Sequence, residues 1–187
     1  EKMEMKPNKT DITAIVEKLI LEKQKMPLAI QRKLSISVNK PTFKTPTVWC
    51  DVKKITHVIS NLLDNAIYYT EQGGVTINYE LVGDKYFKIN VTDTGAGISA
   101  EDKKILFQKF SRGRDASSIR PDGSGLGLYI SKKIVEGNNG EMTCASKGAG
   151  KGSTFSFTVP VYQSQQAIGT QEEPMIKKDK IIVFEKN

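Results

Sequence analysis

The sequence has few cysteines and no long apolar run, and each absence excludes a class of protein. Its 187 residues contain only Cys50 and Cys144, which are too few for a disulfide framework and too widely spaced for a zinc site. No apolar stretch approaches the roughly 18 residues of a membrane-spanning helix. The N-terminus, EKMEMKPNKT, lacks the apolar core of a signal peptide. We therefore expect reduced thiols, a cytoplasmic location and no membrane contact by this chain, with any anchor lying outside it.

Positive charge is in excess but is not gathered into one segment. The formal net charge is +7, and the lysines are spread from Lys2 to Lys186 without interleaved aromatic residues. This pattern is typical of a solvated surface and argues against nucleic-acid binding. Hydrophobic residues make up 38% and charged residues 26% of the chain, a composition that predicts one soluble globular domain with a tail.

The spacing of apolar residues predicts an α+β domain. Helical spacing predicts helices at 11–25, from Asp51 to residue 67, at 100–106 and at 126–136. Alternating spacing predicts strands at 33–40, 75–81 and 86–93 and in the segments MTCASK and STFSFTV, with a short extended piece at 48–49. These elements predict a two-layer α/β sandwich, in which helices cover one face of a mixed, mostly antiparallel sheet.

The domain is predicted to run from residue 10 to residue 161. Residues 1–9 are interpreted as a linker from a dimerisation and phosphoacceptor region that is absent from this chain. Residues 162–175 have the composition of a second linker, and polar residues 111–124 predict a mobile loop inside the domain. The final segment, 176–187, contains a short strand pattern that fits either the first strand of a receiver domain or a docking tail.

Two polar clusters stand on or beside predicted elements. Asn61 and Asn65 lie four residues apart on one helix face, where amide oxygens can coordinate magnesium without adding negative charge beside a triphosphate. Asp93-Thr-Gly95-Ala-Gly97 directly follows a strand. A carboxylate there can accept a hydrogen bond from an exocyclic amine, and the glycines allow close backbone approach. Taken singly, the asparagine pair is explained more simply by helix capping or surface polarity, and an ordinary turn also explains the second cluster, although its pattern is moderately specific.

Two glycine-rich clusters come later in the chain. Gly123-Ser-Gly125-Leu-Gly127-Leu precedes a helix, so its backbone N–H groups can bind phosphate. Its spacing and the preceding polar loop do not match a dinucleotide-binding fold, and no Gly-Lys-Ser/Thr follows as in a Walker loop. Gly150-Lys-Gly152-Ser-Thr154-Phe forms a turn from which a hydroxyl can reach a base directly or through water, although a simple hairpin also explains it.

In order and spacing, the four clusters together resemble the ATP-binding domain of sensor histidine kinases. This domain has the Bergerat fold and belongs to a superfamily with gyrase B, Hsp90 and MutL (GHKL). NLLDNA is similar to the N box, DTGAGI and GSGLGL to the first two glycine boxes, and GKGSTF to the third glycine motif. The segment FQKFSR, residues 107–112, resembles the F box that begins the ATP lid. The resemblance covers roughly residues 10–161.

The resemblance implies that the chain binds Mg-ATP and transfers the γ-phosphoryl group to a histidine on a separate dimerisation domain. A response regulator would then be a further partner. The implied catalytic residues are Asn61, Asn65 and Arg112, with Asn65 holding Mg²⁺. Asp93 should bind the adenine amino group, and Tyr69 should lie against the adenine ring.

The remaining implied contacts surround the same nucleotide. The glycines of the two boxes should pass beneath the base or contact phosphates, Thr154 should assist Asp93 through water, and basic lid residues should approach the phosphates. The implied nucleotide-binding set is Asn61, Asn65, Tyr69, Asp93, Gly95, Gly97, Ile98, Lys109, Arg112, Gly123, Ser124, Gly125, Leu126, Gly127, Leu128 and Thr154.

Position 68 is the clearest departure from the family pattern. The family often carries Lys or Arg there, facing a phosphate, whereas this chain has Tyr68. A phenol is uncharged at neutral pH, and charge-assisted hydrogen bonds are roughly twice as strong as neutral ones. We predict a weaker grip on phosphate at this position, or compensation by Arg112, Arg114 or Arg120 of the lid.

The sole histidine, His57, does not fit a phosphoacceptor. A valine follows it where an acid is usual, and it lies one turn before Asn61 on the apolar-striped helix, so a structural or surface role is predicted. The acceptor would then lie upstream or on another protein. Hydrolases of the superfamily tend to have a glutamate base at the position of Asn61. We therefore predict that this chain hydrolyses bound ATP slowly.

Two other functions fit the same nucleotide fold. One is a serine kinase of the anti-sigma type, which an upstream helix with a His-Glu or His-Asp pair would exclude. The other is a nucleotide-binding regulator that has lost transfer activity and acts through lid movement, a reading that Tyr68 favours.

Overall fold

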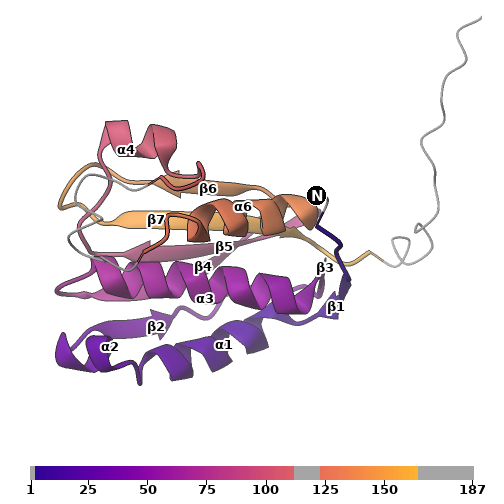
Figure 1. Ribbon diagram of the computed structural model, residues 1–187. Helices are drawn as coiled ribbons and strands as arrows, with labels where there is room; N and C mark the ends of the chain where they lie inside the picture. The colour runs from indigo at the N-terminus through magenta and orange to yellow at the C-terminus, as the bar shows by residue number, and fades with distance from the viewer. Residues whose placement is uncertain (1–2, 112–122, 164–187) are drawn as a thin grey trace, which may run out of the picture.

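The strands that were predicted from alternating apolar residues pair into a five-stranded sheet (Figure 1). The computed structural model describes residues 3–111 and 123–163, and the sheet has the order β2-β4-β5-β7-β6. Only β2 and β4 pair in parallel, and every other neighbouring pair is antiparallel. The predicted α+β class with a mixed, mostly antiparallel sheet is confirmed. The strands are β2 (Ser35–Val38), β4 (Gly74–Val82), β5 (Tyr86–Asp93), β6 (Met142–Ala145) and β7 (Ser153–Pro160).

The long helices cover one face of this sheet, as Figure 1 shows for α1, α3 and α6. Inward-facing residues of the strands alternate with outward polar ones, so the core lies between the sheet and these helices. The parallel pairing of β2 and β4 requires a crossover, and α3 provides it. The helices are α1 (Ile12–Lys23), α2 (Pro27–Gln31), α3 (Val52–Tyr69), α4 (Ala100–Ile105) and α6 (Gly127–Gly137).

Helix α3 is the central element of the helical layer. Asp51 caps its start by accepting a hydrogen bond from the Lys54 N–H at 3.1 Å. All members of the predicted apolar stripe are buried, and a buried aliphatic side chain contributes about 1.5–3 kcal/mol to stability. Away from this stripe, the helix carries the polar residues Asn61 and Asn65, which are partly buried. The stripe consists of Ile55, Val58, Ile59, Leu62, Leu63, Ala66 and Ile67.

Two short elements were not predicted from the sequence. Strand β1 (Asn8–Thr10) lacks apolar alternation, yet it pairs antiparallel with β3 (Val48–Cys50). Its pairing therefore depends on contacts with distant segments, such as the Lys9 ammonium, which lies 5.0 Å from the ring centroid of Tyr162. Helix α2 begins at Pro27, just beyond the end of the helix predicted at 11–25. Proline suits the first turn of a helix, because no intrahelical partner awaits its missing N–H.

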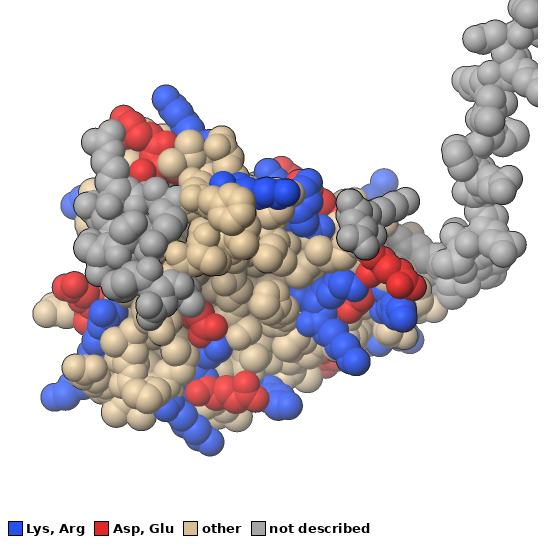
Figure 2. All heavy atoms as spheres, in the orientation of Figure 1, with Lys and Arg blue, Asp and Glu red and all other residues tan. Residues whose placement is uncertain are grey.

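The surface carries mixed charge and no concentrated basic stripe on the face drawn in Figure 2, where lysines and arginines alternate with acidic residues. Both thiols are shielded, since burial raises the pKa of Cys50 to about 11 and that of Cys144 to about 12. Neutral thiols are weak nucleophiles, so neither is suited to catalysis. None of the helices in residues 3–111 and 123–163 combines the length and the apolar character required to cross a bilayer.

Asn138 joins the end of α6 to the start of α3. Its side-chain oxygen accepts a hydrogen bond from the buried Asp51 N–H at 2.7 Å, and its amide donates to the Ile134 carbonyl at 2.8 Å. Only 5% of Asn138 is exposed, so water cannot replace these bonds. The two helices are thereby locked together at the end that lies away from the tip of β5.

Replacing this side chain with alanine should destabilise the whole domain. Asn138→Ala leaves the buried Asp51 N–H without its acceptor, which should cost about 1–3 kcal/mol in the free energy of unfolding. Urea denaturation followed by circular dichroism measures this loss. A suitable control is Asn39→Ala, because Asn39 bonds Asn78 on the exposed surface and should cost less than about 0.5 kcal/mol. Equal losses for the two variants would contradict the locking role.

Candidate active site

Asp93 stands at the last position of β5 with its carboxylate turned into the protein. The residue is 5% exposed, and its side chain accepts a hydrogen bond from the Gly95 N–H at 2.8 Å. The Ser153 N–H donates to the same oxygen at 3.3 Å, and the Ser153 hydroxyl donates to the other oxygen at 2.5 Å. A carboxylate has about four acceptor positions, so capacity for one ligand N–H is left.

Ser153, which the sequence interpretation passed over, is the hydroxyl residue beside Asp93. Thr154 was predicted to assist there, but its hydroxyl lies 3.0 Å from that of Thr92. Strand pairing explains the difference, because Asp93 pairs with Ser153 and Thr92 pairs with Thr154, and neighbouring residues point to opposite faces. The signal was present in the sequence. Alternation along β7 places Ser153 on the same face as the core residue Phe155.

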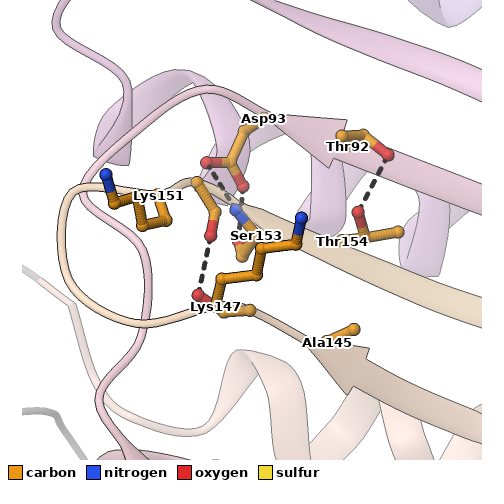
Figure 3. Close-up of a pocket in the computed structure, with 9 residues that line it drawn as sticks. Thr92, Asp93, Ala145, Lys147, Lys151, Ser153 and Thr154 are labelled. Atoms are coloured by element: carbon orange, nitrogen blue, oxygen red, sulfur yellow. Dashed lines mark hydrogen bonds between the residues drawn. The ribbon is translucent and has the colours of Figure 1, made fainter.

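A hollow of about 330 Å³ lies at this end of β5, β6 and β7 (Figure 3). Across the paired strands, Thr154 lies opposite Thr92 on one side and Ala145 on the other. In each strand, a residue next to these in sequence packs in or against the core. These three residues therefore line the hollow on the face of the sheet that points away from the helices. Asp93 and Ser153 form its border and separate it from the helical layer. The lining consists of Thr92, Asp93, Ala145, Ser146, Lys147, Lys151, Gly152, Ser153 and Thr154.

The segment after Asp93 lies tightly against the end of α3. The Ala96 N–H donates to the Tyr69 carbonyl at 2.9 Å, and a Cβ on Gly95 would come within 2.1 Å of that carbonyl oxygen. Gly97 has φ +68°, and a side chain there would meet the Gly148 carbonyl at 2.1 Å. The first glycine box is thus shaped by backbone-to-backbone contact, which brings Asp93, Gly95 and Tyr69 together.

On the helical side, Asn61 of α3 faces the first turn of α6. The Asn61 amide donates to the Ser131 hydroxyl at 3.0 Å, and a Cβ on Gly127 would lie 2.7 Å from the Asn61 oxygen. Gly127 is the first residue of α6, and the preceding Leu126 gives no side-chain cap. The N–H groups of this turn are therefore oriented for an anion. Asn65 lies one turn further along α3 on the same side and is partly buried.

The second glycine box also contacts the F box. A Cβ on Gly125, which has φ +69°, would lie 2.8 Å from the Phe110 carbonyl carbon. The Lys109 ammonium lies 5.1 Å from the centroid of the Tyr129 ring, so the predicted basic residue rests against α6. The described residues on either side of 112–122 therefore meet in space. Arg112, Arg114 and Arg120 lie outside the described residues.

The other predicted residues fall around the same region. Ile98 is partly buried against the core, and its N–H donates to the Ser146 hydroxyl at 3.0 Å. The exposed hydroxyl of Ser124 accepts a hydrogen bond from the Leu126 N–H at 3.3 Å, and Leu128 packs against the core. Gly123 is partly buried at the start of the second described segment. His57 is exposed on α3.

Comparison with known proteins identifies the family. A profile described as "Histidine kinase-, DNA gyrase B-, and HSP90-like ATPase" matches residues 50–163, more than half of the chain. The chain is 32% identical over 173 residues to the adaptive-response sensory kinase SasA of Parasynechococcus marenigrum (strain WH8102), covering 89% of this chain and 44% of that protein. It is 30% identical over 164 residues to the sensor protein EvgS of Escherichia coli (strain K12), covering 84% of this chain and 14% of EvgS. The chain therefore spans less than half the length of these relatives.

Solved structures show the same fold. Full-length ShkA in complex with AMPPNP matches with a TM-score of 0.73 and 23% identity, covering 88% of this chain and 33% of ShkA. The nucleotide-free catalytic domain of histidine kinase ThkA matches with a TM-score of 0.69 and 22% identity, covering 85% of this chain and 99% of that domain. The profile match, which extends from β3 to beyond β7, shows the family: the chain belongs to the histidine kinase-, DNA gyrase B- and HSP90-like ATPases.

Proposed function

We propose that this domain binds Mg-ATP between α3, α6 and the end of β5, and transfers the γ-phosphoryl group to a histidine on a separate dimerisation domain. It would act in two-component signalling, with a response regulator as the next acceptor. The observation that carries this proposal is the arrangement of Asp93 and Asn61. A buried carboxylate ends a strand beside the end of α3, and an asparagine of α3 faces the uncapped N-terminus of α6.

Asp93 would recognise the adenine base by a hydrogen bond. Its carboxylate is held by Gly95 and Ser153, which leaves acceptor capacity for the adenine amino group. Guanine presents a carbonyl oxygen where adenine presents this amine, and two acceptors repel each other. The rigid placement of Asp93 therefore supports adenine as the preferred base. Tyr69, at the end of α3, is proposed to lie against the ring.

The phosphates would lie at the first turn of α6. The close approach of Gly127 to Asn61 leaves no room for a side chain, so the N–H groups of this turn can come near an anion. Neutral amide oxygens suit magnesium beside a triphosphate, and Asn65 is the residue proposed to hold the ion, with Asn61 assisting. Mg²⁺, when bound, would neutralise charge on the phosphates.

Transfer to a protein acceptor is favoured over hydrolysis. An asparagine amide cannot take a proton from water near neutral pH, and Asn61 occupies the side of α3 that faces α6. Catalysis would then depend on positioning and charge neutralisation, as is usual for phosphoryl transfer. Lys109, fixed against Tyr129, is proposed to supply positive charge near the phosphates.

A transfer assay tests the proposal directly. The chain is mixed with a histidine-bearing dimerisation domain and γ-labelled ATP with magnesium, and acid-labile label on the acceptor is expected. Asn65→Ala should reduce the rate at least about 100-fold, since it removes a group positioned at the developing charge. Asn39→Ala, at an exposed hydrogen bond, is the folded control. Acid-stable label on serine would instead support the serine-kinase alternative.

Ser153 and Thr154 form a matched pair for testing the base site. Ser153→Ala removes a hydroxyl that donates to Asp93, so the dissociation constant for ATP should rise about tenfold. Thr154→Ala removes a hydroxyl that bonds Thr92 on the other face, and affinity should change less than about threefold. Isothermal titration calorimetry with ADP and with ATP measures the dissociation constant of each variant. A larger effect at position 154 would contradict this assignment of roles.

Tyr68 supports a second candidate, a nucleotide-binding regulator that does not transfer phosphate. This residue, partly buried on α3, is uncharged where the family often has a cation. Tyr68→Lys should increase ATP affinity about tenfold if phosphate is weakly held at this position. Titration and the transfer assay should be run together. An unchanged affinity and rate would show that other residues already neutralise the phosphate charge.

A further inference from the structure

Arg32, outside every sequence motif, bonds the last turn of α3. Its Nη1 lies 3.2 Å from the Ile67 carbonyl oxygen, 2.9 Å from that of Tyr68 and 2.9 Å from that of Thr70. Carbonyls in the last turn of a helix lack the usual partner four residues ahead and form the negative end of the helix dipole. Here the Ile67 carbonyl accepts a long backbone hydrogen bond from the Thr70 N–H, at 3.4 Å. The last turn of α3 has no basic residue of its own, so a cation from another segment stabilises it.

The corner that carries Arg32 is itself well ordered by hydrogen bonds. Arg32 is the C-cap residue that directly follows α2, and its N–H donates to the Leu28 carbonyl at 3.0 Å. Lys33 adopts φ +53°, the Leu34 N–H closes the turn onto Ala29 at 3.0 Å, and the Ser35 N–H donates to the Gly73 carbonyl at 3.0 Å. The guanidinium therefore extends from a fixed point, and its hold on α3 is not that of a loose surface side chain.

The segment that directly follows Asp93 is attached to the end of α3 and to the loop that leaves it. The Tyr69 carbonyl, at the last residue of α3, accepts the Ala96 N–H at 2.9 Å. In the loop after α3, the Thr94 hydroxyl donates to the Gln72 carbonyl and accepts from the Gly74 N–H, each at 3.0 Å. A shift in the end of α3 would therefore move the residues that directly follow the carboxylate.

We propose that Arg32 is a positioning residue for base recognition, acting through the end of α3 on the placement of Asp93. This inference rests on the proposed function, because it assumes that Asp93 reads adenine. Without Arg32, the last turn of α3 should loosen and the carboxylate should lose its exact placement relative to the base. Discrimination between ATP and GTP depends on that placement, so it should fall together with ATP affinity.

This role is tested by the dissociation constants for ATP and GTP. Each nucleotide is titrated into each variant in the presence of magnesium, at a temperature well below the unfolding midpoint of that variant. Arg32→Ala should weaken ATP binding about tenfold and reduce the ATP-to-GTP preference by a similar factor. Arg32→Lys keeps the positive charge and three N–H donors but loses the planar guanidinium, so it should recover part of the preference. The matched control is Asn138→Ala, which removes a buried hydrogen bond to Asp51, the cap at the opposite end of α3. It should lower stability and leave the preference unchanged.

The results separate the inference from the proposed function. A lower preference in Arg32→Ala, partial recovery in Arg32→Lys and none of the change in Asn138→Ala would support positioning by Arg32. If Arg32→Ala only lowered the unfolding midpoint and kept the wild-type preference, Arg32 would have a structural role and the proposed function would stand. A wild-type chain that bound ATP no better than GTP would overturn both.

Discussion

The buried apolar side of α3 is the constraint on which the rest of the structure depends. Seven residues of this helix are buried against the sheet, and this burial sets the rotation of the helix. Once that rotation is set, Asn61 and Asn65 have to lie on the side that faces α6. Hydrophobic packing of α3 thereby positions Asn61 and Asn65, the polar residues proposed to contact a metal ion and phosphate.

The ends of α3 are held in different ways, and the difference matches the function proposed for each end. At the start, Asn138 and the Asp51 cap lock the helix to α6 through buried bonds. Burial tends to raise the pKa of Asp51, but hydrogen bonds from Lys6 and Lys54 lower it below its ordinary value. The ionised carboxylate therefore adds stability at neutral pH, and that stability is lost as the pH falls through the lowered pKa. At the far end, Arg32 and the glycine box link the helix to the proposed base site.

The glycines of the first two boxes show why the family pattern is so restrictive. Gly95, Gly97 and Gly127 each occupy a position where a Cβ would come within 2.7 Å of another group of the protein. Their role in this structure is to let α3, α6 and the turn before β7 approach one another. A neighbouring protein segment or a ligand can come close to the backbone only where no side chain is in the way. Glycine therefore allows both kinds of contact.

The sequence by itself determined the helices and strands with strong periodicity, the sheet class and the position of the motifs. Those features follow from local patterns, such as the stripe of α3 and the alternation of β4 and β5. Tertiary structure decided the rest. Strand β1 forms only because β3 lies beside it. Alternation along β7 indicates the face on which Ser153 lies, but only strand register, a long-range property, sets its hydroxyl next to Asp93. Arg32 carries no motif, and only the folded chain brings it to the carbonyls of a helix more than thirty residues away.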